Sequence, residues 1–217
     1  MPLKTVDEVD KTYVISCIAH YTVVNLGVKR GGCAMPKCKP LPSLERLREV
    51  FELDQINGRI FWKERKLEEF ASEKTWKIWH TRCAGKEAGS LKENGYRTVP
   101  LDGKARLVHR IVFEMANDTV LGEEEEIDHR DGNPKNNQPR NLRIATCAQN
   151  ARNSKCQKNS KFGLKGVRRE KRGLGYSSII YVDQKHVFLG MFKTPEEAHA
   201  AYAKASRELH GEFGRAA

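Results

Sequence analysis

The segment from Ile127 to Asn150 constrains the fold most, because its centre is suited to a tight loop and both of its flanks carry apolar residues. The central DGNPKNN is dense in turn formers: Gly takes positive φ freely, and Asn and Asp tolerate it. Leu142 and Ile144 alternate with polar neighbours, which predicts a strand over 141–146. Thr146 is a suitable N-cap for a helix that follows. The segment therefore predicts strand, loop, strand and helix.

Four polar side chains of this segment suit metal-assisted attack on a phosphodiester, namely Asp128, His129, Asn141 and Asn150. A histidine can take a proton from water, and a divalent cation compensates the negative charge that develops on the phosphate. Mg²⁺ prefers oxygen ligands and needs few from the protein, so Asp128, His129 and Asn150 would form a minimal set. Neighbours on a strand point to opposite faces, so Asp128 and His129 can share a site only if the strand ends or twists there.

These residues and their spacing resemble the HNH endonucleases, in which a ββα-metal motif surrounds one divalent ion. The resemblance implies that His129 is the general base and that Asp128 binds the metal, which we expect to be Mg²⁺ or Mn²⁺. It also implies that Asn141 fixes the loop through backbone hydrogen bonds. Asn150 takes the final position, where this branch of the family uses Asn in place of His as a metal ligand.

The region before this segment has the pattern of a small sheet with a helix. Residues 44–51 predict an amphipathic helix, followed by a turn at an Asn-Gly pair and a strand through Ile60 and Trp62. Residues 85–107 predict two or three strands, because the Asn-Gly and Asp-Gly pairs within them favour tight hairpins. This arrangement also resembles the N-terminal flank of phage-type HNH proteins.

Two further features lie close to the candidate site in the sequence. His109 is part of an apolar helical pattern with Leu107, Ile111 and Met115, and we assign it a packing or phosphate-contact role. The four glutamates at 123–126 immediately precede the site. Because a run of like charges usually forms a solvated face, we leave them outside the site.

The composition favours a polyanionic partner. The chain has 217 residues and a formal net charge of +11, although basic charge alone does not separate nucleic acid from an anionic membrane. It has no run of about 18 apolar residues and no convincing signal peptide, so we predict a soluble cytoplasmic protein without a membrane partner, in the host bacterium if it is phage-encoded. The six cysteines form no CxxC pair, which favours reduced thiols and argues against a structural zinc site, with Cys33 and Cys38 the best candidate pair.

A strongly basic stretch follows the candidate site. Between positions 152 and 172 one acid, Glu170, stands among nine basic residues, which are Arg152, Lys155, Lys158, Lys161, Lys165, Arg168, Arg169, Lys171 and Arg172. Each phosphate that such a residue neutralises releases counterions, so we expect this stretch to lie along a DNA backbone. The alternative is a solubilising linker.

The last part of the chain predicts three strands and one helix. The strands cover residues 166–169, 176–182 and 186–191. The helix begins after Thr194, an N-cap whose capping box is completed by Glu197, and it stops at Gly211. A stripe of small residues along the helix would let it pack closely on the sheet.

The sequences GVRRE and FLGMFKTPEEAHAAYAKASRELHGEF resemble the DNA-binding domain of plant APETALA and ethylene-response transcription factors, which is also common in phage HNH homing endonucleases. In that family the three-stranded sheet lies in the major groove. The resemblance implies DNA contacts from Arg168, Arg169, Tyr176, Ser178, Lys185 and His186. The family often has Trp and Arg where this chain has Tyr176 and Ser178, so base specificity is not carried over. The side chains expected to pack beneath the helix are Phe188, Leu189 and Phe192.

Together these features predict an α+β protein: a ββα-metal HNH motif with a small flanking sheet, followed by a three-stranded antiparallel sheet packed on one helix. The expected ranges are an irregular segment at 1–43, an HNH domain at 44–151, a basic linker at 152–162 and a DNA-binding domain at 163–217.

The expected function is a Mg²⁺-dependent, site-directed DNA endonuclease of the phage homing type. It would nick double-stranded DNA as a monomer, because a single-metal site cuts one strand. An alternative of a different class is a DNA-binding transcriptional regulator with an inactive HNH remnant. A third alternative is a nuclease directed at RNA.

Overall fold

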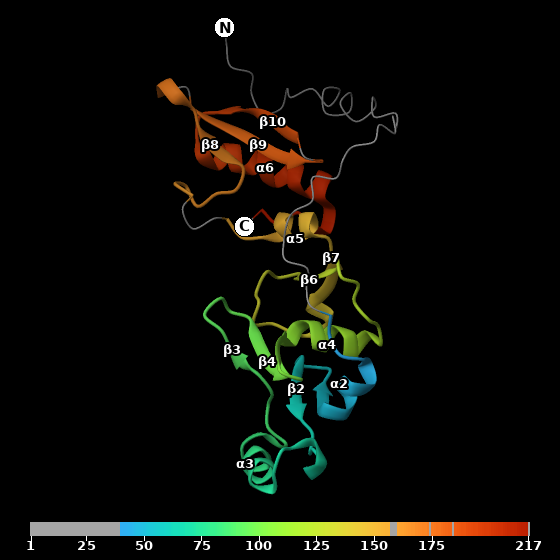
Figure 1. Cartoon of the computed structure of the whole chain (residues 1–217). Helices are drawn as coiled ribbons and strands as arrows, with labels where there is room; N and C mark the ends of the chain where they lie inside the picture. Colours follow the sequence, from blue (N-terminus) through green and yellow to red (C-terminus); the bar gives the residue numbers. More distant parts are fainter. Residues whose placement is uncertain (1–39, 157–159, 174, 184, 217) are drawn as a thin grey trace. The chain divides into compact units, whose positions relative to one another are not determined.

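The structure is a computed structural model that describes residues 40–156, 160–173, 175–183 and 185–216 (Figure 1). Most of the segment at 1–43 lies outside these residues, as do Cys33, Cys38 and Lys158. The described part has the predicted α+β architecture, with small antiparallel sheets of two or three strands. Within these ranges no helix is both long and apolar enough to cross a membrane.

A helix and a hairpin begin the described part of the chain. Helix α2 (Leu44–Val50) is followed by strands β1 (Phe51–Asp54) and β2 (Arg59–Trp62), which pair antiparallel. The Ser43 hydroxyl caps α2 by accepting a hydrogen bond from the third residue after it. Phe51, which we expected in the helix, is instead the first residue of β1. It pairs with Trp62 and is buried against it. Burial of the Phe51 side chain in the core therefore ends the helix one residue earlier than expected.

A helix that the sequence did not predict, α3 (Glu73–Cys83), follows the 3₁₀ turn η2 (Leu67–Glu69). It buries no residue fully, and its Trp79 contacts Trp62 edge-on at a centroid distance of 5.6 Å. The predicted flanking sheet comes next, with strands β3 (Ser90–Leu91), β4 (Arg97–Leu101) and β5 (Lys104–Leu107). Asp102 and Gly103 both have positive φ, as the predicted Asp-Gly hairpin turn requires.

Helix α4 (Val108–Asn117) forms the centre of the larger hydrophobic core. Its Ile111 and Val112 are fully buried with side chains from α2, β1, β2 and β4. The same helix also contacts β6 and β7, the strands that carry the candidate site (Figure 1). The core therefore fixes the candidate site against the flanking sheet.

The predicted strand, loop, strand and helix are all present. They are β6 (Glu126–His129), a loop ending in the 3₁₀ turn η3 (Pro139–Asn141), β7 (Leu142–Ala145) and α5 (Cys147–Asn153). Strands β6 and β7 pair antiparallel, with Asp128 opposite Arg143. Thr146 caps α5, and Gln149 completes a capping box.

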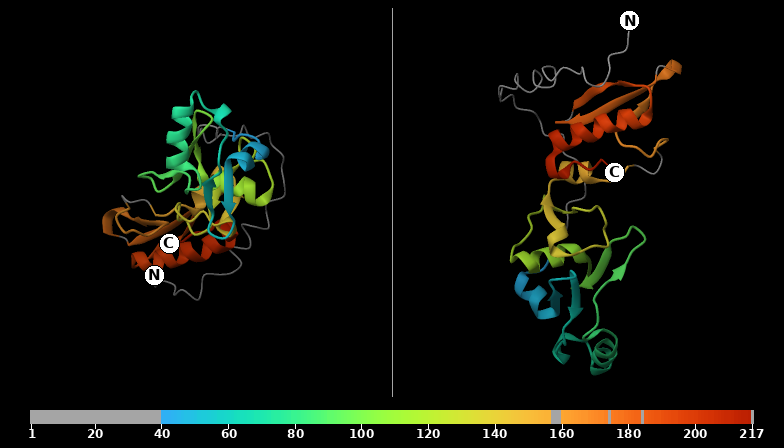
Figure 2. Two further views of the ribbon diagram at one scale, coloured as in Figure 1. Left: turned by 90° about the horizontal axis from the view of Figure 1, so that it is seen from below. Right: turned by 180° about the vertical axis from the view of Figure 1, so that it is seen from behind.

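The C-terminal part forms the predicted sheet and helix. Strands β8 (Val167–Arg169), β9 (Tyr176–Val182) and β10 (Lys185–Phe192) form an antiparallel sheet in the order β10-β9-β8, with the 3₁₀ turn η4 (Lys171–Gly173) after β8. Helix α6 (Pro195–His210) covers one face of this sheet and leads into η5 (Gly211–Phe213) (Figures 1 and 2). Ile180, Tyr202 and Ala205 form the core between helix and sheet.

Two side chains of this sheet differ from the sequence-based expectation. Phe188, expected beneath the helix, is 61 % exposed, because it pairs with Ile179 on the face turned away from α6. A register irregularity between Phe188 and Gly190 follows it. Ser178, expected to contact DNA, is fully buried, since it lies on the same face of β9 as Ile180. Leu189 packs against the core as expected.

Candidate functional site

The end of β6 brings the predicted site residues together. The polar side chains that line a cavity of about 130 Å³ include Tyr96, Asp128, His129, Asn150, Asn153 and Lys155. Asp128 and His129 can share this cavity because β6 ends at His129. The His129 carbonyl accepts a hydrogen bond from the Gly132 amide at 2.7 Å, where the chain turns away.

Asp128 is buried and held by two neighbours. Its Oδ2 accepts a hydrogen bond from Arg143 Nε at 2.9 Å and lies 2.8 Å from Arg143 Nη2. The Asn153 amide donates to both carboxylate oxygens at 2.8 and 2.9 Å, and to the His129 carbonyl at 2.7 Å. The guanidinium balances the charge of a carboxylate that would be costly to bury alone. Sequence analysis missed both partners, because strand register and helix placement create these contacts.

His129 is buried, and its ring is oriented by its neighbours. Its Nε2 lies 3.0 Å from Asn137 Oδ1. The ring centroid is 6.0 Å from that of Tyr96 and 5.1 Å from that of His109. With Asn137 Oδ1 as the acceptor, Nε2 carries the proton and Nδ1 keeps its lone pair, which is the form that a general base needs. Asn137 was missed because each Asn of the loop has the same turn-forming signal.

The Asn141 side chain fixes the loop between β6 and β7. Its amide donates to the Asn136 carbonyl at 2.8 Å and to Asp131 Oδ1 at 3.0 Å. Its own carbonyl accepts from the Asp131 amide at 3.1 Å. Burial raises the pKa of Asp131, but hydrogen bonds from Asn133, Asn136 and Asn141 outweigh it and lower that pKa. Asp131 is thus an ionised acceptor around which the loop is organised.

Asn150 is oriented by a glutamate that we had left outside the site. Its Nδ2 donates to Glu126 Oε2 at 2.6 Å. Because the amide nitrogen is committed to Glu126, the carbonyl oxygen on the other side of the planar group remains as the group that can accept or ligate. Glu126 is the first residue of β6 and is half-buried, so the expectation of a solvated glutamate run does not hold for this residue.

Asp128 and Asn150 are the groups that could hold a divalent cation. Both bring oxygen atoms to the same cavity. A hard cation such as Mg²⁺ takes few protein oxygens and keeps several waters, which this sparse set allows. In the described ranges, no group of three or more His, Cys, Asp or Glu side chains could hold a metal ion. Oxygen donors such as these are the ligands that Mg²⁺ and Mn²⁺ prefer, whereas zinc favours nitrogen and sulfur ligands.

His109 is buried on α4 beside the candidate base. It is 5 % exposed, and burial, together with the nearby His129 and Arg110, lowers its pKa from 6.5 to about 3. Its ring centroid lies 5.3 Å from that of Tyr96. His109 is therefore neutral at physiological pH, which agrees with the packing role expected from the sequence.

The free energy of unfolding is expected to depend on pH through His109. Because its pKa is lower in the folded chain, the unfolded chain binds the extra proton, and stability is lost as pH falls from 6.5 toward 3. This group should lower the free energy of unfolding by about 2 kcal/mol between pH 6.5 and pH 5. Urea denaturation should show that His109→Gln lacks this part of the loss. An equal loss in the parent and the variant would contradict the prediction.

The turn between β1 and β2 supports the loop that carries Asn137. Gly58 has a φ of +66°, and a Cβ at this position would lie 2.0 Å from the Asn137 carbonyl oxygen. The backbone of the turn and that of the loop are thus in direct contact, which only glycine permits. Through Asn137, this contact extends to the ring of His129.

We expect Gly58→Ala to displace the Asn137 loop and to lower the rate of phosphodiester cleavage by about tenfold or more, because small displacements of a catalytic group are costly. Gly103→Ala is the matched control: Gly103 has a φ of +71°, but nothing lies within 4 Å of the added Cβ. Both variants place alanine at a positive φ, which should lower the melting temperature by a comparable amount in each. Thermal melting followed by circular dichroism measures this change. Equal cleavage rates in the two variants would show that the contact does not matter.

The basic residues between positions 152 and 172 have different surroundings, and Lys165 is bound within the protein. Lys165 Nζ donates to the backbone carbonyls of Arg152, Ser154 and Arg215 at 2.9, 2.6 and 2.9 Å. Burial, followed by the nearby Arg215, lowers the pKa of Lys165. This ammonium group joins distant backbone segments, which corrects the expectation that it contacts DNA.

The remaining predicted DNA-contact residues differ in exposure. The exposed ones are Lys155, Lys161, Arg168, Arg169, Lys171, Lys185 and His186. Arg152 and Tyr176 are half-buried, and Arg152 Nη2 lies 3.9 Å from Asp183. Lys158 and the side chain of Arg172 lie outside the described residues.

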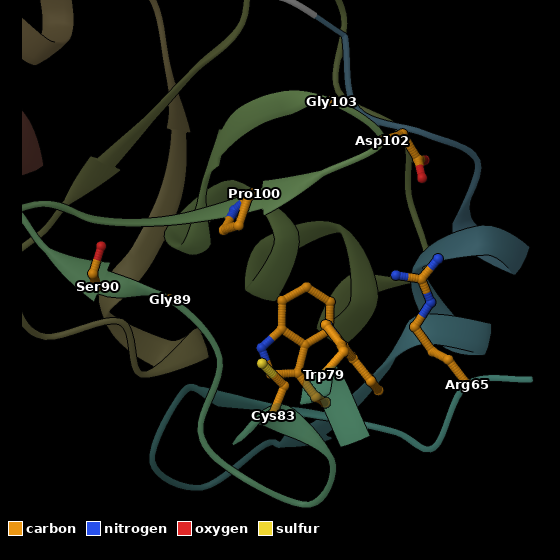
Figure 3. Close-up of a pocket in the computed structure, with 9 residues that line it drawn as sticks. Arg65, Trp79, Cys83, Gly89, Ser90, Pro100, Asp102 and Gly103 are labelled. Atoms are coloured by element: carbon orange, nitrogen blue, oxygen red, sulfur yellow. The ribbon is translucent and has the colours of Figure 1, made fainter. Parts of the chain in front are cut away.

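A larger cavity, of about 570 Å³, lies between α3 and the β3–β5 sheet (Figure 3). The Arg65 guanidinium on its wall is 5.5 Å from the centre of the Trp79 ring. The carboxylate in its lining, Asp102, lies 3.5 Å from Arg46. Because its lining holds no imidazole and its charges are paired, this cavity suits hydrolysis less well than the smaller one.

Comparison with known proteins matches residues 106–152 to a family model described as HNH endonuclease. The chain is 35 % identical over 113 residues to protein 3.8 of Escherichia phage T7, covering 52 % of this chain and 91 % of that protein. It is 31 % identical over 123 residues to an HNH endonuclease of Acanthamoeba polyphaga mimivirus, covering 57 % and 63 %. A solved structure of the HNH homing endonuclease I-HmuI shares 24 % identity over 52 % of this chain and 55 % of that one, with a TM-score of 0.33.

Proposed function

Because this chain belongs to the HNH endonuclease family, we propose that it is a site-directed DNA endonuclease of the homing type. The observation that carries the proposal is the cavity at the end of β6, where Asp128, His129 and Asn150 meet. A carboxylate, an imidazole and an amide oxygen around one small cavity form a set suited to phosphodiester hydrolysis.

In the proposed mechanism His129 takes a proton from the attacking water at Nδ1, while Asn137 holds the Nε2 proton and sets the tautomer. Asp128 and Asn150 would hold Mg²⁺ or Mn²⁺, and such an ion would compensate the charge on the phosphate and the leaving oxygen. Lys155 lines the same cavity and offers a positive charge to a non-bridging phosphate oxygen. Since the described part of the chain carries one such set of residues, a monomer would nick one strand.

The outer face of the β8–β10 sheet is the proposed DNA-reading surface. On the side turned away from α6 it carries exposed Arg168, Tyr181, His186 and Phe188, with the Tyr181 and His186 rings 5.1 Å apart. Guanidinium and aromatic groups on an open sheet can contact phosphates and base edges in a groove. Of the contact residues implied by the resemblance, we keep Arg168 and His186 on the outer face, and we add Phe188 and Tyr181.

Arg168→Ala is expected to weaken DNA binding and to reduce the slope of log K against log salt by about one, because one phosphate contact is lost. Fluorescence anisotropy with a labelled duplex, in EDTA and over a series of salt concentrations, measures both effects. Arg82→Ala removes an exposed arginine from α3 and serves as the control. If the two variants give the same slope, the outer face of the sheet is not the DNA surface.

The proposed function is tested first by cleavage of a random DNA library and sequencing of the ends, which identifies the target site. A supercoiled plasmid that carries this site is then incubated in Mg²⁺ and in EDTA, and relaxed circles in Mg²⁺ alone are the expected product. Binding to the site without any cleavage would favour the transcriptional regulator. Preferential cleavage of structured RNA over duplex DNA would favour the RNA-directed nuclease.

A further inference from the structure

The segment that follows α6, Gly211–Ala216, contacts the nuclease motif at several points. Arg130 Nη1 lies 2.7 Å from Glu212 Oε2. Arg215 Nη1 donates to the Asp131 carbonyl, beside Gly132, where a Cβ would collide with that guanidinium. The Arg215 carbonyl in turn accepts from Lys165 Nζ, which also binds two carbonyls at the end of α5. The end of the chain is thereby tied to both the loop and the helix of the motif.

Arg143 is the centre of these contacts. One edge of its guanidinium binds Asp128, while Nη1 donates to the Glu212 carboxylate and to the Glu212 carbonyl, both at 3.0 Å. Its central carbon lies 3.7 Å from the centre of the Phe213 ring, which is 9 % exposed. Arg143 is 6 % exposed, so its position is set by these groups and not by water.

We propose that Glu212 and Phe213 are positioning residues of the nuclease site, which act through Arg143 on Asp128. The inference rests on the proposed function, in which Asp128 holds the cation. Phe213 and Glu212 fix the plane of the guanidinium, and the guanidinium fixes the carboxylate, as the partners of metal ligands commonly do. The segment that follows the C-terminal sheet and helix α6 therefore contributes to the nuclease site.

The negative charge of Glu212, like its position, is expected to favour cation binding by Asp128. Arg143 has one positive charge and contacts two carboxylates, Asp128 and Glu212. Hydrogen bonds from Arg130 and Arg143 lower the pKa of Glu212, which keeps it ionised. Without this second carboxylate the guanidinium would neutralise Asp128 more completely, and Asp128 would attract a cation less strongly. Loss of Glu212 should thus weaken cation binding for two reasons with the same sign.

The test measures binding of Mn²⁺ alone to the full-length chain by electron paramagnetic resonance and calorimetry. Glu212→Gln and Phe213→Leu are each expected to raise the Kd for Mn²⁺ by about tenfold, the lower end of the scale for direct partners of metal ligands, because both act through Arg143. Glu124→Gln removes the same charge from an exposed residue close to β6 and should leave the Kd within about twofold of the parent value. Thermal melting of each variant identifies a temperature at which all of them are folded, and the binding measurements are made at that temperature.

A second measurement separates positioning through Arg143 from general support of the fold. Arg143→Lys keeps the charge but removes the planar fork that joins both carboxylates. In this background Glu212→Gln is expected to change the Kd by less than about twofold, because the route to Asp128 is already broken. A full tenfold effect there, or an unchanged Kd in the single variants, would overturn the inference. If the parent chain itself binds no Mn²⁺, and Asp128→Asn therefore shows no loss of binding, the proposed function fails as well.

Discussion

Replacing His129 with alanine is expected to lower the rate of DNA cleavage by a factor on the order of 10²–10⁴, the contribution typical of a positioned general base. The ring is buried beside Asp128, and its Nε2 is held by Asn137, so Nδ1 is the ring nitrogen left to accept a proton. Single-turnover cleavage of an end-labelled duplex in Mg²⁺ measures the rate. The affinity for the same duplex in EDTA should be unchanged.

His80→Ala is the control for the His129 experiment. His80 is a half-buried histidine on α3, beside Trp76 and away from the β6–β7 motif. Its replacement should leave the cleavage rate within about twofold of the parent rate, as is usual for a substitution outside the active site. A His129→Ala enzyme that cleaves as fast as the His80→Ala enzyme would remove His129 from the mechanism.

Arg143→Met is expected to cause the largest loss of stability among these variants. Arg143 and Asp128 are 6 % and 4 % exposed and lie 2.8 Å apart, so removal of the guanidinium leaves a buried carboxylate without its counter-charge. The free energy of unfolding should fall by about 3–5 kcal/mol, the usual result of breaking a buried pair. Urea denaturation near neutral pH, followed by tryptophan fluorescence, provides the measurement.

The exposed pair Arg48–Asp118 gives a matched comparison. Its atoms also lie 2.8 Å apart, but the side chains are 49 % and 74 % exposed. Arg48→Met should therefore cost no more than about 1 kcal/mol, because water screens such a pair. Equal losses in the two variants would mean that burial of the Asp128 pair does not govern its contribution, and that Asp128 is solvated in solution.

These two experiments concern different properties of the same few residues. His129 is expected to act mainly on the rate, whereas Arg143 is expected to affect both rate and stability, because it holds Asp128 and is itself held by Glu212 and Phe213. Breaking the buried Arg143–Asp128 pair is therefore expected to destabilise the motif. Such pairs fix geometry, which is what a site with few metal ligands requires.

The local features of the fold followed from the sequence because their signals act over a few residues. Thr146 and Thr194 both cap the helices predicted for them, each with a capping box three residues on. The hairpin turn at Asp102 and Gly103 and the strands of the C-terminal sheet also match. The α+β class is confirmed, and the DNA contacts assigned by resemblance stay predictions.

The faces of individual side chains were harder to predict. Phe188 was placed on the wrong side of the C-terminal sheet, because alternation along a strand depends on register, and β10 has an irregularity after Phe188. Ser178, assigned to DNA by resemblance, is fully buried. Phe51 was placed in a helix, since an apolar residue fits either pattern and its pairing with Trp62 decided the outcome. Helix α3 escaped prediction because it has no buried stripe.

The sequence by itself determined which chemical groups the site contains, because Asp128, His129, Asn141 and Asn150 are close along the chain and carry a recognisable spacing. Only the tertiary structure decided what holds those groups in place. Asn137 meets His129 across a loop, Glu126 meets Asn150 across a strand and a helix, and Glu212 reaches Arg143 from the far end of the chain. Contacts of this kind depend on register and packing between distant segments, which no local pattern encodes.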